Sequence, residues 1–120
     1  MNVMIVGEKE KSEIIIKNLK NYGAEISFVN LEKDDEVDVK KLEESRIEFA
    51  DLFIASTDKD KKNLFLCQVA KKIYKVGKTI AVVNNPNNME FMRNEGIDFT
   101  ISVNLFLINS IKHCMKAIES

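Results

Sequence analysis

The chain has 120 residues, of which 45% are hydrophobic and 31% charged, and this balance is typical of one soluble globular domain covering residues 1–120. A formal net charge of −1 and the absence of Trp exclude the basic groove and the aromatic platform of nucleic-acid-binding domains. No apolar run approaches the roughly 18 residues of a membrane span, and Met1 leads directly into strand residues without a signal peptide, so we expect a cytoplasmic protein that does not insert into a membrane.

The first apolar run, Val3–Gly7, predicts a buried strand that turns sharply into a helix. The helix is expected over about Glu10–Asn21, and Gly23 ends it. We expect this helix to bury one broad apolar face made of Ile14, Ile15, Ile16, Leu19 and Tyr22. The next segment, Glu25–Asn30, predicts a second strand that a right-handed crossover makes parallel to the first.

Residues 31–41 are dominated by charge and predict a solvated loop that leads into a helix over about Asp38–Phe49. A third strand is expected at Asp51–Ser56. Thr57 or Asp58 should then cap a long helix that reaches Tyr74.

A fourth strand at Lys78–Asn84 is apolar on both faces, which is typical of a parallel sheet covered by helices on both sides. Pro86 starts a short helix that closes at Gly96. A short strand at Ile97–Val103 and a helix at about Asn104–Glu119 follow. The regular alternation predicts an α/β fold, a doubly wound parallel sheet with helices on both faces.

The turn after the first strand resembles the opening of a dinucleotide-binding unit, which requires G-x-G-x-x-G. Gly7 occupies the first glycine position, but Lys9 and Ser12 stand at the second and third. Two readings remain open, an anion site at a helix N-terminus or a strand–helix turn that uses Gly7 only for its backbone freedom. Thr57 and Asp58 follow the third strand, at the crevice where open α/β sheets bind ligands.

No catalytic or metal-binding constellation is predicted. Cys67 and Cys114 are isolated and read as reduced thiols that pack in helices. His113 is next to Cys114, but adjacent helical residues do not face each other and no orienting acid accompanies them.

Three stretches together resemble the TrkA N-terminal family, also known as RCK domains, the regulators of potassium conductance. They are residues 3–19, residues 50–64 with Ala-Ser-Thr-Asp at 55–58, and residues 83–102 with Asn-Asn-Pro at 84–86 and Gly-Ile-Asp at 96–98. The resemblance implies a Rossmann-like fold in a cytosolic, dimeric regulator. It also implies that NAD(H) or an adenine nucleotide is the ligand and that a potassium channel or transporter is the membrane partner.

The departures from the family pattern fall on the ligand site. Lys9 offers a side chain that would either clash with a dinucleotide or neutralise a phosphate. Asn30 stands where the family usually has an acidic residue for the ribose, and Val82 stands where many members have Arg. We therefore expect weak or absent NAD binding, with a mononucleotide or simple anion near Gly7 and Thr57 as the favoured ligand.

The resemblance also implies a deletion, since only about twenty residues separate the second and third strands, too few for the family's further helix and strand. We expect five parallel strands in the order 2-1-3-4-5. The candidate ligand-binding residues are Gly7, Glu8, Lys9, Asn30, Thr57 and Asp58.

Three functions are compatible with the sequence. The favoured one is a non-catalytic, nucleotide-sensing regulatory domain of potassium transport. The alternatives are a fragment of an NAD(P)-dependent oxidoreductase and a dimeric interaction module without a ligand.

The last helix predicts a homodimer. Its apolar stripe is expected to rest on the domain's own sheet with one face and to need cover on a second. The stripe consists of Leu105, Ile108, Ile111, Met115 and Ile118, widened by Phe106, Leu107 and Cys114.

Overall fold

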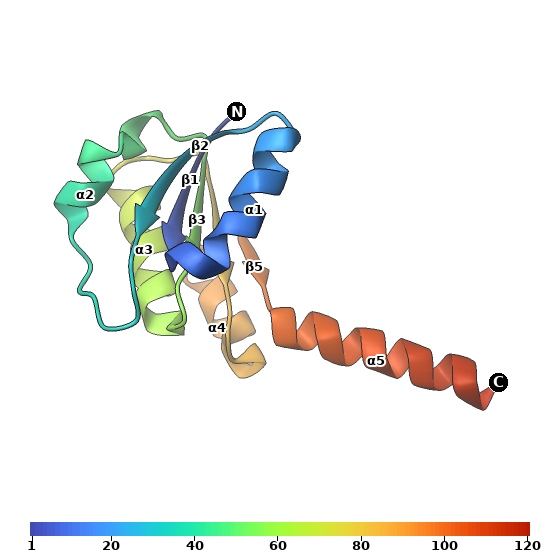
Figure 1. Ribbon diagram of the computed structural model, residues 1–120. Coiled ribbons are helices and arrows are strands. Elements are labelled where there is room, and N and C mark those ends of the chain that lie inside the picture. Colours follow the sequence, from blue (N-terminus) through green and yellow to red (C-terminus); the bar gives the residue numbers. More distant parts are fainter.

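The computed structural model describes residues 1–120 as a five-stranded parallel sheet with helices on both faces (Figure 1). The strands are β1 (Asn2–Gly7), β2 (Glu25–Asn30), β3 (Leu52–Ser56), β4 (Lys78–Val82) and β5 (Phe99–Ile101). The helices are α1 (Lys9–Asn21), α2 (Val39–Glu44), α3 (Asp60–Lys72), α4 (Met89–Asn94) and α5 (Val103–Glu119), with 3-10 turns η1 (Ile47–Phe49) and η2 (Pro86–Asn88). The sheet with all elements up to β5 is called the body below.

The strand order is β2-β1-β3-β4-β5, which confirms the predicted order and the predicted count of five. All neighbouring pairs are parallel, so their carboxyl ends lie at one edge of the sheet. At that edge Gly7 is the register partner of Asn30 on one side and of Ser56 on the other. The direction of the crossovers reverses between β1 and β3, which creates a crevice at their carboxyl ends.

The main core lies between one face of the sheet and helices α2, α3 and α4 (Figure 1). Met4, Phe53 and Ala81 supply the sheet side, and Leu42 and Leu66 supply the helix side. All five are almost completely buried, so this layer accounts for most of the apolar area removed from water.

The second face of the sheet is covered by α1 over β1 and β2 and is open over the remaining strands. Val3 and Ile5 are buried beneath α1. Ile54, Ile80 and Val82 are only half-buried, and Phe99 and Ile101 of β5 are 54% and 49% exposed. The sequence predicted that helices cover both faces of the sheet, but on the second face they cover only β1 and β2.

Helix α1 does not bury the broad face that its sequence predicts. Ile14 is 69% exposed and Tyr22 is 90% exposed, while Ile16 and Leu19 are half-buried. The prediction was wrong because an apolar stripe needs a neighbouring layer to cover it, and no second helix packs beside α1 on this face (Figure 1).

Helix α5 extends away from the body, and every residue in it is exposed (Figure 1). The molecule measures 54 Å along its longest axis against 32 and 28 Å along the others. The prediction that one face of this helix rests on the chain's own sheet is wrong, as is the prediction that Cys114 packs in a helix interface of this chain. No helix in the structure combines the length and the apolar character that crossing a bilayer requires.

Two other elements differ from the sequence prediction. The helix predicted at Asp38–Phe49 is interrupted by Arg46, whose positive φ of 68° ends α2 and leaves Phe49 exposed in η1. The last strand is shorter than predicted, because Ser102 already caps α5 by accepting a hydrogen bond from the backbone N–H of Leu105 at 3.1 Å.

Candidate ligand site at the carboxyl edge of the sheet

The fold brings all six predicted ligand-binding residues to the carboxyl edge of the sheet. Gly7, Glu8 and Lys9 leave β1, Asn30 ends β2, and Thr57 and Asp58 leave β3. The register places the β1 turn between the other two. The residues therefore surround the crevice where an open α/β sheet binds its ligand.

Gly7 is required by a close approach of two strands. A Cβ atom at this position would lie 2.8 Å from the carbonyl oxygen of Ser56 and 3.1 Å from Oγ of Ser12. The Ser12 hydroxyl is itself fully buried and has no hydrogen-bond partner. A larger residue at position 7 would clash with the backbone of β3, and because Gly7 has no positive φ, close packing rather than backbone freedom requires glycine here.

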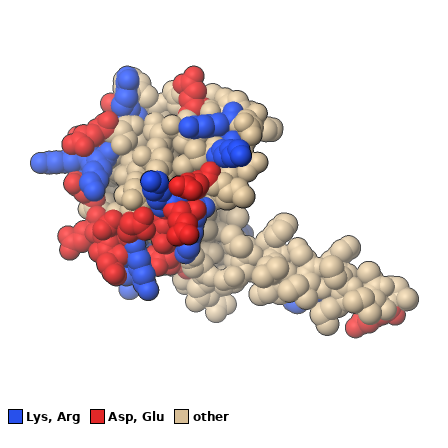
Figure 2. Space-filling view, viewed as in Figure 1, with Lys and Arg blue, Asp and Glu red and all other residues tan.

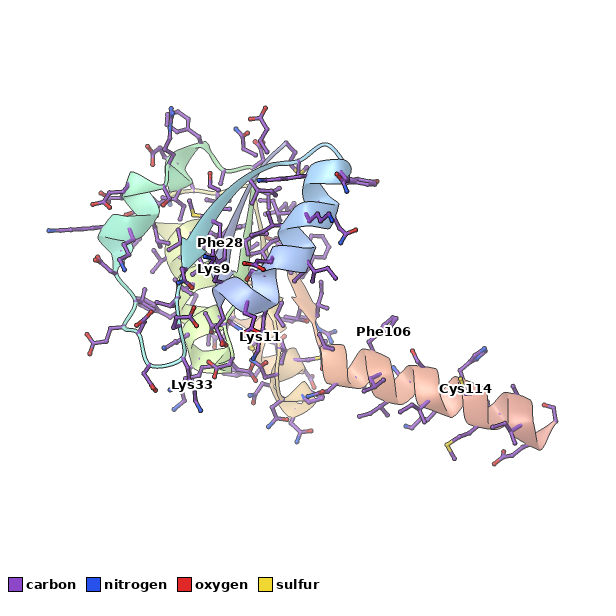
Figure 3. The ribbon with its side chains drawn as sticks, viewed as in Figure 1. Lys9, Lys11, Phe28, Lys33, Phe106 and Cys114 are labelled. Carbon is purple, nitrogen blue, oxygen red and sulfur yellow. The ribbon has the colours of Figure 1, made fainter.

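The first turn of α1 presents backbone donors to solvent. The N–H of Lys9 is occupied, because it donates to Oδ1 of Asn30 at 3.2 Å. The N–H groups of Glu10 and Lys11 open the helix, where no intrahelical acceptor exists for them. Figure 3 shows the side chains of Lys9 and Lys11 at this end of the helix and that of Lys33 on the loop after β2.

The charges around these donors largely offset one another. The Lys11 ammonium lies 3.5 Å from the Glu8 carboxylate, and Glu10 adds a second negative charge in the first turn. Lys9 remains exposed and forms no ion pair. It is therefore the cation of this turn that is available to an incoming anion.

The polar groups of Thr57 already form hydrogen bonds within the carboxyl edge of the sheet. It is buried, and both its N–H and its hydroxyl donate to Oδ1 of Asn63, at 2.9 and 2.6 Å. The Asn63 amide donates in return to the carbonyl oxygens of Thr57 and Val82. The predicted capping role is wrong, because Lys59 is the N-cap of α3 and neither Thr57 nor Asp58 caps the helix.

Asp60 organises the loop after β4, a role that the sequence prediction missed. Its carboxylate accepts hydrogen bonds from the N–H and side-chain amide of Asn84, the N–H of Asn85 and the side-chain amide of Asn88, at 2.6–3.0 Å. Partial burial alone would raise the pKa of Asp60, but these hydrogen bonds outweigh it and hold the pKa below its ordinary value. The available signal was the Asn-rich run after an apolar strand, which offers many donors to one carboxylate.

A polar depression of about 470 Å³ lies between the loops that follow β3 and β4. It has no apolar lining residue, and it is formed by Asp58, Lys59, Asp60, Lys61, Asn84, Asn85 and Asn88. Oδ1 of Asp58 is buried there without a hydrogen-bond partner. The depression suits a polar, hydrated group rather than a hydrophobic ring.

The edge carries no activated nucleophile. Burial of Cys67 in α3 raises its pKa to about 12, so this thiol stays protonated at neutral pH. His113 and Cys114 are on α5, which extends away from the edge (Figure 1). No group of three or more His, Cys, Asp or Glu side chains is placed to hold a metal ion.

Comparison with known proteins agrees with this fold. A family model described as the TrkA-N domain matches residues 3–103. The chain belongs to the TrkA-N domain family. In this chain, the Gly7 turn and the Thr57 turn lie at the crevice that the strand order creates.

Individual relatives are longer than this chain. The Trk system potassium uptake protein TrkA homolog of Methanothermobacter thermautotrophicus is 43% identical over 65 residues, which is 54% of this chain and 30% of that protein. A structure of the GsuK channel bound to NAD matches 99% of this chain and 24% of its own, with a TM-score of 0.84 and 19% identity. A structure of GsuK bound to ADP matches 84% of this chain and 30% of its own, with a TM-score of 0.72 and 19% identity. The chain thus spans about a third or less of each of these proteins.

Proposed function

We propose that residues 1–120 form a regulatory domain of a potassium transport system, which senses a nucleotide or a related anion without converting it. The observation that carries this proposal is the set of backbone donors and Lys9 at the β1–β3 crevice of a TrkA-N domain. A cytoplasmic location beside a membrane channel or transporter subunit fits a family relative named as a potassium uptake protein.

The shape and charge of the crevice favour a mononucleotide or simple anion over a full dinucleotide. Lys9 stands where a dinucleotide-binding turn uses glycine to let the pyrophosphate approach the backbone. Asn30 replaces an acidic ribose ligand and already uses its amide oxygen to accept from the Lys9 N–H. The GsuK structures contain NAD in one case and ADP in another, and we infer that the ADP-like part is the one this chain retains.

A non-catalytic role is supported by the polar groups of the edge. Thr57, Asn63 and Asp60 are engaged in internal hydrogen bonds, and no base–nucleophile pair lies in the crevice. The alternative of an oxidoreductase fragment would need a catalytic pair of side chains, and none of the ionisable groups at the edge is arranged as one. The alternative of an interaction module without a ligand is decided by the binding experiment below.

Assembly into a homodimer through α5 completes the proposal. The helix has 17 residues and buries none of them in its own chain. Figure 2 shows that α5 carries few charged side chains on the visible side, in contrast to the body. An apolar helix without cover and an open apolar sheet face in one molecule are complementary surfaces for a second copy.

The ligand prediction is tested by measuring thermal unfolding of the full chain with AMP, ADP, ATP, NAD(H) or NADP(H) at millimolar concentration. We expect a mononucleotide to raise the unfolding temperature more than NAD(H), because we expect it to bind more tightly. A ligand at 100 times its dissociation constant adds about 2.7 kcal/mol to the free energy of unfolding. Lys9→Gly should weaken binding of ADP several-fold, because it removes the unpaired ammonium that would neutralise a phosphate at this turn. Lys17→Gly, on the same helix but away from its first turn, is the matched control.

Two outcomes would contradict this prediction. Sub-micromolar affinity for NAD or NADH by calorimetry would show that Lys9 and Asn30 do not prevent dinucleotide binding. If none of these nucleotides stabilises the protein at millimolar concentration, the nucleotide-sensing proposal fails and the interaction module is favoured.

A further inference from the structure

Strand β2 is an edge strand whose outer backbone groups are free. Its odd-numbered residues face β1, as the bonds from Glu25 N to Met1 O and from Leu31 N to Gly7 O show, at 3.0 and 2.9 Å. Because successive residues of a strand alternate, the N–H and C=O groups of Ile26, Phe28 and Asn30 point away from the sheet. No loop or side chain of the chain forms a hydrogen bond with these backbone groups.

The edge also lacks the features that keep natural edge strands from pairing. Between Glu25 and Asn30 there is no Pro, no Lys and no bulge. Phe28 is half-buried, and Figure 3 shows it on β2 at this side of the sheet. The opposite edge strand, β5, has only three residues, so β2 is the edge able to accept a full strand.

We propose that β2 pairs with β2 of a second copy of this chain in an antiparallel ladder centred on Phe28. The residues with outward backbone groups are Ile26, Phe28 and Asn30. A two-fold axis that passes beside Phe28 exchanges Ile26 of one copy with Asn30 of the other. Phe28 then faces Phe28 of the second copy, and Ile26 faces Asn30 of the second copy. Each such pair exchanges two hydrogen bonds, so three pairs supply about six and join two sheets into one.

Arg46 near one end of β2 and the acidic loop at the other favour a second copy as the occupant, and Glu25 offsets part of this attraction. A groove of about 400 Å³ lies beside the amino end of the strand, and Arg46, Glu25 and Phe49 are among its lining residues. The loop that follows the carboxyl end, residues 31–38, contains five acidic residues and one lysine. Figure 2 shows acidic side chains gathered in the part of the body where Figure 1 places that loop. Antiparallel pairing brings Arg46 of each copy toward the acidic loop of the other, twice by symmetry.

This surface is separate from α5. Strands β2 and β5 are the two edge strands of the sheet, and α5 follows β5. The β2 edge and the start of α5 therefore lie on opposite sides of the sheet. A chain that uses both surfaces forms assemblies of four copies or longer chains, whereas a chain that uses the β2 edge alone forms pairs. The test below separates these cases.

The test places like charges on the proposed two-fold axis. Sedimentation velocity is measured on the full chain, on Phe28→Lys, on Phe28→Glu and on an equal mixture of the two variants. Each variant alone should lose edge pairing and show half the wild-type mass or less, since residue 28 faces itself across the axis. The mixture should regain the wild-type mass, because Lys at position 28 of one copy then faces Glu at position 28 of the other.

Phe65→Lys and Phe65→Glu are the matched controls, because Phe65 is partly exposed on α3 and lies off the sheet edge. If circular dichroism shows that either residue-28 variant does not fold, Ile26→Pro is used instead. This substitution removes an outward N–H that forms no hydrogen bond within the sheet. A fall to half the wild-type mass or less is expected whether or not α5 dimerises, so failure of the α5 proposal leaves this test valid. Equal masses for wild type and both variants, or a mixture that does not recover, would overturn the proposal.

Discussion

At the scale of single residues, the amide of Asn63 joins the ends of two neighbouring strands. It is completely buried, donates to carbonyl oxygens after β3 and in β4, and accepts from two groups of Thr57. The sequence shows an Asn in the first turn of a helix, which usually indicates a capping or solvent-exposed position. Its partners are 6 and 19 residues away, and only the fold brings them together.

Asn63→Ala should therefore destabilise the protein by about 2–4 kcal/mol, because a buried N–H, a hydroxyl and two carbonyl groups lose their partner. Urea unfolding followed by circular dichroism measures the change. Lys61→Ala on the exposed side of the same turn should stay within about 0.5 kcal/mol of wild type. A loss below about 1 kcal/mol for Asn63→Ala would mean that water satisfies these groups.

Asp60 and Asp98 make the stability depend on acid pH. Partial burial opposes ionisation of Asp98, but hydrogen bonds from Lys71 and Thr79 outweigh it and lower its pKa, as the Asn residues do for Asp60. For a carboxyl group whose folded pKa lies below its unfolded value of 3.8, the added stability is present above that value and is lost as the pH falls below it. The free energy of unfolding should fall as the pH drops below about 4 because of these groups.

Asp60→Asn and Asp98→Asn should each lower the stability at pH 7 and make the acid limb less steep. Equilibrium unfolding at a series of pH values measures both effects. Asp34→Asn, in the exposed loop after β2, is the control and should leave the curve unchanged. An acid limb of unchanged slope in both variants would assign the acid sensitivity to other carboxyl groups.

At the scale of elements, the sequence predicted which segments form strands and helices far better than it predicted which helix faces are buried against other elements. Gly23 and Gly96 adopt positive φ where helices were predicted to end, and all five strands lie within or close to their predicted ranges. Burial of α1 and α5 was predicted from apolar periodicity, which reports that a helix has an apolar side but not what lies against it. The break at Arg46 could not be predicted, because Arg carries no preference for a left-handed conformation.

Ile108→Lys combined with Ile111→Lys should disrupt association through α5 while the body remains folded, because no residue of this helix is buried in its own chain. The dimer dissociation constant should rise by about 30-fold or more, the equivalent of about 2 kcal/mol. Analytical ultracentrifugation measures the mass against the 13.7 kDa of one chain. The pair Asn109→Lys and Ser110→Lys adds the same charge at the polar positions beside them and should have a smaller effect. A wild-type protein that sediments as a single 13.7 kDa species at micromolar concentration would contradict the dimer itself.

At the scale of the whole molecule, the strand order was predicted from the resemblance to the TrkA N-terminal family and the shortened segment between the second and third strands, and the structure confirms it. Much of the candidate site followed from the sequence as well, since Gly7, Asn30 and Thr57 end or follow neighbouring strands. The Asp60 centre did not, because its partners Asn84 and Asn88 come from a loop more than twenty residues away. The open half of the second sheet face also escaped prediction, since it depends on α5 leaving the body rather than returning to cover it.

The detachment of α5 has a consequence for the life of a newly made chain. The body is built from consecutive strand–helix–strand units, all of which precede α5 in the chain and are therefore synthesised before it. The 17 residues of α5 emerge after the body, and a helix of that length without tertiary contacts is only marginally stable in water. Until a second copy arrives, the chain exposes an apolar helix of the kind that chaperones and proteases recognise. The abundance of the protein in a cell should then follow the supply of partner subunits more closely than the intrinsic stability of the body.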